Sequence, residues 1–261
     1  LSGALILDES ASMTMLSLAK MVPTAISSLM GTVVGVFNPQ ITIAYAEGDK
    51  EKLVDIIKSC NRILIFIMSI PIAFLTAYGR DFYALWQPTK DPDMLQRLSL
   101  LAVGVLYVSM SIQVLYHVFI ITKKVKWNSL VVLGSGICSS LLSLILLSKT
   151  DLGVACFPLS SMLTGVLRNM IFTPIYAARC LEIRWNRFYS DIFLGFASIG
   201  TITVLGLLSR MIVPIHSWII LLLTGVVMGP LALLVNFFVI LRKQERKMVI
   251  GMVRSRLKGE A

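Results

Sequence analysis

The chain has 261 residues, of which 56% are hydrophobic and 15% are charged, and its mean hydropathy is +0.82. Because soluble domains carry about a quarter charged residues, this composition excludes an ordinary soluble domain. It also excludes a disordered chain and a short disulfide-linked secreted scaffold. These numbers therefore point to a membrane protein.

Seven apolar segments of helix length follow one another along the chain. About 20 apolar residues are needed for a helix to cross a bilayer, and strand-type alternation of polar and apolar residues is absent. We therefore expect a polytopic all-α bundle. The predicted spans are Met13–Tyr45, Ile56–Gly79, Leu95–Thr122, Asn128–Ser148, Leu152–Ala178, Ile192–Val213 and Trp218–Leu241.

The net charge of +10 is distributed unevenly between alternate loops. Short cytoplasmic loops of membrane proteins carry an excess of Lys and Arg, so the basic side is expected in the cytoplasm, together with the basic tail formed by residues 242–261. This pattern explains the charge without a nucleic-acid partner, and the tail could also rest on anionic lipid headgroups. The basic side carries Lys50, Lys52, Lys58, Arg62, Lys123, Lys124, Lys126, Arg179, Arg184, Arg187 and the tail cations, and the other side carries Arg80, Lys90, Arg97, Lys149 and Arg210.

Lys20 and Arg168 are the two cations that fall inside predicted spans. A cation at the centre of a transmembrane helix costs about 2.5 to 3.5 kcal/mol on insertion scales, so such residues usually face a protein interior or a hydrated cavity. Two structural alternatives stay open. Lys20 could extend to the interface, and Arg168 could be a tether to a backbone carbonyl or to a carboxylate in a missing segment of the protein.

Polar side chains accompany both cations at helical spacing. Thr24 is one turn from Lys20 on a face of small and polar residues, which suits either close helix packing or the wall of a hydrated cavity. Thr164 precedes Arg168 by four residues, and Asn169 follows it. We therefore expect substrate contacts from Arg168, Lys20, Thr24, Thr164 and Asn169.

Metal, redox and hydrolytic chemistry lack support in the sequence. Its four cysteines lie far apart, with no C-x-x-C pair and no histidine at ligand spacing. The motifs G-x-S-x-G and H-E-x-x-H and the P-loop are also absent. We expect no catalytic residue, no metal and no cofactor.

One stretch of the sequence resembles a known family. Asn38-Pro39-Gln40 leads through Ala44-Tyr45-Ala46-Glu47-Gly48-Asp49-Lys50-Glu51 to a helix with Arg62 and Pro71, and Tyr83-Ala84-Leu85-Trp86 follows in a predicted external loop. This pattern looks like the polysaccharide flippases of O-antigen type in the MOP superfamily. The likeness is best from residue 11 to about residue 87.

The resemblance implies a two-lobe transporter with fourteen helices, in which the spans of this chain are the eighth to the fourteenth. The expected divisions are residues 1–190 in the C-terminal lobe, 191–241 as two peripheral helices and 242–261 as the cytoplasmic tail, with the other lobe in a missing N-terminal part. Trp218–Leu241 suits a peripheral place because Thr224 and Asn236 alone interrupt its apolar character.

The resemblance also implies an activity without a covalent step. Such a protein would move an undecaprenyl-diphosphate-linked oligosaccharide across the bacterial inner membrane by alternating access through a cationic cavity. Its partners would be this substrate, membrane lipids and the polysaccharide polymerase machinery.

Two alternatives stay open. A multidrug exporter of the same superfamily would be expected to have an acidic or aromatic cavity. A membrane-embedded glycosyltransferase could use Asp91 and Asp93 to bind a metal.

Overall fold

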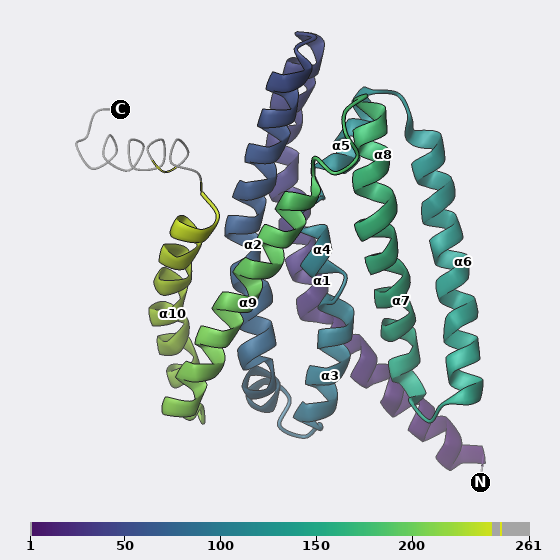
Figure 1. Cartoon of the computed structure of the whole chain (residues 1–261). Helices are drawn as coiled ribbons and strands as arrows, with labels where there is room; N and C mark the ends of the chain where they lie inside the picture. The colour runs from purple at the N-terminus through teal and green to yellow at the C-terminus, as the bar shows by residue number, and fades with distance from the viewer. Residues whose placement is uncertain (1, 242–245, 247–261) are drawn as a thin grey trace.

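The computed structural model describes residues 2–241 and Arg246, with side chains from Ser12 onward. Six helices of the described residues are long and apolar enough to cross a membrane, which confirms a polytopic all-α membrane protein (Figure 1). The predicted tail, residues 242–261, lies outside the described residues apart from Arg246. The helices are α1 (Ser2–Ala46), α2 (Lys50–Trp86), α3 (Pro92–Val103), α4 (Leu106–Ser109), α5 (Leu115–Ile121), α6 (Val125–Lys149), α7 (Cys156–Leu167), α8 (Thr173–Cys180), α9 (Tyr189–Ile212) and α10 (Trp218–Val239).

The third predicted span, Leu95–Thr122, is not one continuous helix. It consists of α3, α4 and α5, which follow one another from the bottom to the top of Figure 1. Between α4 and α5, backbone N–H groups bond to carbonyls three residues back, as in a 3₁₀ turn, including Ser111 N–H to the Val108 carbonyl at 3.0 Å. The expectation of one regular helix here is therefore wrong, whereas the other six predicted spans each correspond to a helix long and apolar enough to cross a membrane.

Close packing accompanies this break. Met110, Ile112 and Val114 are completely buried, so the segment is covered on several sides at once. Gly195 of α9 lies against Ser111, where any larger side chain would collide with the serine hydroxyl. No proline lies between Pro92 and Pro158, so tertiary packing is the feature that accompanies the irregular turns.

Helix α2 is longer than predicted at both ends. The Asp49 side chain accepts a hydrogen bond from the Lys52 N–H and caps the start of the helix. At the other end the helix continues through residues 83–86, so the prediction that this aromatic segment forms an external loop is wrong. The reason is burial, because Tyr83 is fully enclosed and its hydroxyl donates to the Ala19 carbonyl and to Ser99.

Helix α2 lies at the centre of the bundle. It packs along α9 and also contacts α1, α3 and α10. By contrast, α6 and α10 lie at opposite edges of the view in Figure 1 and expose long apolar side chains such as Leu144 and Leu222. Surfaces of this kind suit contact with lipid.

The buried side-chain amide of Asn236 holds α10 against α2. Asn236 donates to the Phe66 carbonyl and to the Ser69 hydroxyl of α2, at 3.0 and 2.7 Å. Its oxygen accepts a hydrogen bond from Ser198 of α9 at 2.6 Å. The Asn236 amide would otherwise be unsatisfied in an apolar environment, so its hydrogen bonds specify how three helices meet.

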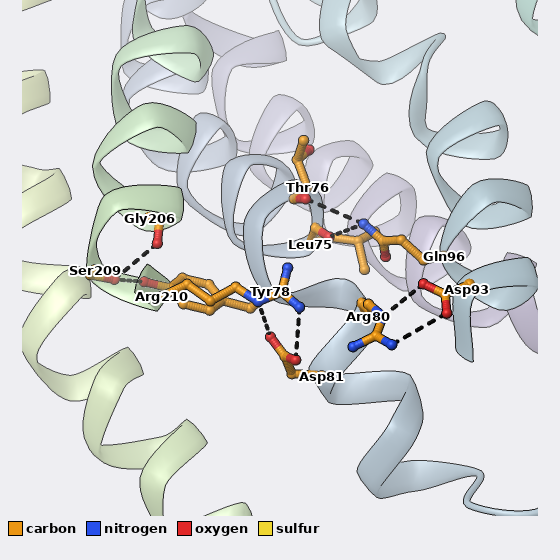
Figure 2. Close-up of polar contacts among 10 residues, drawn as sticks. All are labelled: Leu75, Thr76, Tyr78, Arg80, Asp81, Asp93, Gln96, Gly206, Ser209 and Arg210. Atoms are coloured by element: carbon orange, nitrogen blue, oxygen red, sulfur yellow. Dashed lines mark hydrogen bonds and ion pairs between the residues drawn. The ribbon is translucent and has the colours of Figure 1, made fainter. Parts of the chain in front are cut away.

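Two ion pairs connect the C-terminal end of α2 to α3 and α9 (Figure 2). Arg80 pairs with Asp93 of α3 at 2.6 Å, and Asp81 pairs with Arg210 of α9 at 2.7 Å. The side chains of the first pair are each 47% exposed, whereas Asp81 is 10% and Arg210 is 29% exposed. The pairs differ mainly in their access to solvent.

This difference predicts unequal effects on stability. Asp81→Asn leaves a partly buried Arg210 without its counter-charge and should lower the free energy of unfolding by about 2 kcal/mol. Asp93→Asn disrupts a solvated pair and should change it by less than about 1 kcal/mol. Thermal unfolding of the purified variants in detergent measures both, and equal shifts would show that burial does not set the strength of these pairs.

Candidate functional site

Lys20 and Thr24 line a groove between α1, the α3–α4 segment and α7. The groove has a volume of about 340 Å³ and also includes Ser27, Ser28 and Ser161. Its remaining wall is formed by apolar side chains such as Leu101 and Met162. A cation and several hydroxyl groups thus face a hollow in a largely apolar bundle.

The Lys20 ammonium is exposed in this groove. Among the side chains that the structure describes, none forms an ion pair or a hydrogen bond with it. A bare ammonium is poorly accommodated by hydrocarbon, so Lys20 requires water, an anion or access to the membrane interface.

Arg168 lies where the transmembrane segment 153–180 changes its helical winding. The five residues Arg168–Phe172 form a π-helical turn between α7 and α8. Turns of this kind occur frequently at functional sites. The half-buried guanidinium donates from Nη1 to Ser135 of α6 at 3.3 Å and from Nε to Asn169 Oδ1 at 3.2 Å.

These partners of Arg168 are neutral. Within residues 12–241, no carboxylate lies within ion-pair distance of its guanidinium. A tether to a carboxylate in a missing segment of the protein stays a prediction. A hydroxyl and an amide orient the cation but leave its charge available to an anion.

Asn169 is 1% exposed and is held from three directions. Its oxygen accepts from Tyr116 Oη at 2.8 Å as well as from Arg168, and its nitrogen donates to Ser109 Oγ at 2.7 Å. Asn169 can therefore act on a ligand only through its neighbours. Ser109 and Tyr116 are not among the predicted site residues. Their spacing of seven residues would place both side chains on one face of a regular helix, and this pattern could have indicated them.

The structure brings the predicted site residues together in two groups. Lys20 and Thr24 line the groove. The side chains of Arg168 and Asn169 are hydrogen-bonded to each other and do not line it. Thr164 donates to the Ser160 carbonyl of its own helix at 2.9 Å. Both groups border α6, because the hydroxyl of Ser161 in the groove lies 3.3 Å from that of Ser139, and Arg168 donates to Ser135.

The acidic pair considered for metal binding has other partners. Asp91 Oδ1 accepts from the Asp93 N–H at 2.9 Å and caps α3. The Arg80 guanidinium, through its hydrogen bond and charge, lowers the pKa of Asp93. No cluster of three or more His, Cys, Asp or Glu side chains suited to a metal occurs in the described part of the chain.

Fold and site together define a polytopic α-helical membrane protein with a cationic groove and a second buried cationic centre. The chain is 26% identical over 232 residues to EpsK of Bacillus subtilis strain 168, which is described as an uncharacterized membrane protein. That alignment covers 89% of this chain and 46% of the relative, so the chain spans about half the length of EpsK. No family model and no solved structure matches the chain.

Proposed function

We propose that the protein is part of a flippase that moves a lipid-linked oligosaccharide, carried on undecaprenyl diphosphate, across the bacterial inner membrane. The observation that carries this proposal is the presence of two cations, Lys20 and Arg168, in helices apolar enough to cross a membrane and without a carboxylate partner among the described side chains. A diphosphate is an anion that could satisfy both charges and accept hydrogen bonds from adjacent hydroxyl groups.

The arrangement of the groove supports a transport role. Thr24, Ser27 and Ser161 supply hydroxyl donors beside Lys20, while the remaining wall is apolar. Such a surface can bind a charged headgroup reversibly without a covalent step. The irregular turns in two neighbouring transmembrane segments further suit a protein that changes shape during transport.

Two likenesses support the same class. The segment from residue 38 to residue 51 resembles the polysaccharide flippases of the MOP superfamily, and the chain is similar over most of its length to a membrane protein, EpsK. In the proposed protein, α1 to α8 belong to the C-terminal lobe of a two-lobe transporter, and α9 and α10 are the two additional peripheral helices. The polymerase machinery that uses the translocated substrate would be a partner outside the membrane.

The alternatives have less physical support. A glycosyltransferase would need Asp91 and Asp93 for a metal, but one caps α3 and the other pairs with Arg80. A multidrug exporter for cationic compounds would require an acidic cavity, whereas the groove contains Lys20 and no acidic side chain among its lining residues.

The function can be tested in a deletion strain carrying plasmid-borne variants of the full-length protein. Loss of the protein should leave the complete lipid-linked glycan on the cytoplasmic side, and mass analysis of the carrier should find a full repeat. Arg168→Gln should reduce polysaccharide export at least tenfold with unchanged membrane abundance, because it removes the charge that no carboxylate offsets. Lys20→Gln should have a smaller effect, since its groove is open.

The double variant Asp91→Asn, Asp93→Asn is the matched control and should export almost normally. A truncated glycan in the deletion strain, together with severe loss in this control, would favour the glycosyltransferase. Normal export by Arg168→Gln would remove the basis of the proposed substrate contact.

The proposed topology has the basic loops and the C-terminal tail in the cytoplasm. In a variant whose four cysteines are replaced by Ala, a cysteine introduced at Lys90 should react with an impermeant thiol reagent in intact cells. A cysteine at Lys124 should react only after the cells are permeabilised. The opposite labelling pattern would reverse the orientation.

A further inference from the structure

Two irregular segments of the bundle meet at Asn169. One is the π-helical turn that begins at Arg168, and the other is the run of 3₁₀ turns between α4 and α5. Next to them, glycines allow the α3–α4 junction and α7 to approach closely, because Gly104 lies against Met162 and Gly165 lies against Val105. The two irregular turns therefore lie in neighbouring transmembrane segments, α3 to α5 and α7 to α8, which pack closely together.

The Asn169 amide bridges both sides of the break between α4 and α5. Its nitrogen donates to Ser109, the last residue of α4, and its oxygen accepts from Tyr116, the second residue of α5. The same oxygen accepts from Arg168 Nε. A change in the angle between α4 and α5 would therefore break or lengthen at least one bond of the group that orients Arg168.

Three features indicate that this bridge does more than fill a polar gap. Asn169 is almost completely buried, so water has little access to replace a lost partner. The bridge is formed across an interruption, where backbone N–H groups bond to carbonyls three residues back instead of continuing the α-helical pattern. Finally, one of its partners is the guanidinium whose charge no described carboxylate offsets.

We propose that Tyr116 and Asn169 are positioning residues that couple the bend between α4 and α5 to the orientation of Arg168 and so regulate its binding of diphosphate. This inference rests on the proposed function, because it requires Arg168 to bind an anion. With the bridge intact, Arg168 Nε is held by Asn169 and Nη1 by Ser135, which aligns the rest of the guanidinium for the ligand. When the angle between α4 and α5 changes, Asn169 moves with the helix to which it stays hydrogen-bonded, and the Arg168 guanidinium is no longer aligned for the ligand.

The test uses the purified full-length protein in nanodiscs and inorganic pyrophosphate as the probe, with binding measured by calorimetry. Tyr116→Phe removes only the hydroxyl group that holds Asn169 and should weaken pyrophosphate binding about five- to tenfold. Tyr107→Phe is the matched control, because Tyr107 makes a hydrogen bond of the same 2.8 Å length to Thr76, away from Arg168. The control should bind pyrophosphate like the unaltered protein.

A double-mutant cycle separates positioning from general stability. If Tyr116 acts through Arg168, Tyr116→Phe should have no further effect on pyrophosphate binding in an Arg168→Gln background. Asn169→Asp, which places a carboxylate beside the guanidinium, should reduce binding about as much as Arg168→Gln while the protein remains folded. Thermal unfolding of each variant verifies folding.

The outcomes distinguish this inference from the proposed function. Unchanged pyrophosphate binding in Arg168→Gln would contradict the anion site and hence the proposed function. Weakened binding in Arg168→Gln together with equal, unaltered affinities in Tyr116→Phe and Tyr107→Phe would overturn the coupling alone. Additive losses in the double variant would also overturn it, because they would assign Tyr116 an effect independent of Arg168.

Discussion

The cost of placing a positive charge in a membrane interior governs the organisation of this protein. Lys20 and Arg168 each need water, an anion or strong hydrogen-bond acceptors, and the described side chains provide no carboxylate for either. The groove beside Lys20 and the polar contacts of Arg168 are two different responses to the same constraint. Both keep the charge available to a ligand.

The rest of the bundle gives these cations a fixed frame. Two other buried polar groups are paired across helices, Asn236 with α2 and α9, and Asp81 with Arg210. These contacts fasten neighbouring helices to α2, which carries much of the buried core. Against this frame, the α4–α5 break and the π-helical turn are the irregular parts, and they meet beside Arg168.

The sequence predicted the fold class because helix-length apolar runs are a strong signal. It also located the two cations and the hydroxyl groups near Lys20 from helical spacing alone. The break in the third span was not predictable in this way, since no proline marks it and burial of Met110 and Ile112 depends on other helices. The hydrogen-bond partners of Arg168 likewise depend on how α6 and α4 pack beside residues 168–172, which hydrophobic periodicity does not report.

Lipid selectivity provides the most direct test of the central claim that both intramembrane cations bind a diphosphate headgroup. Native mass spectrometry can compare retention of polyprenyl diphosphate and polyprenyl monophosphate by the purified full-length protein. The unaltered protein should retain the diphosphate preferentially, and the double variant Lys20→Gln, Arg168→Gln should lose that preference because both cations are absent. Equal diphosphate retention by the double variant and the unaltered protein would contradict the claim.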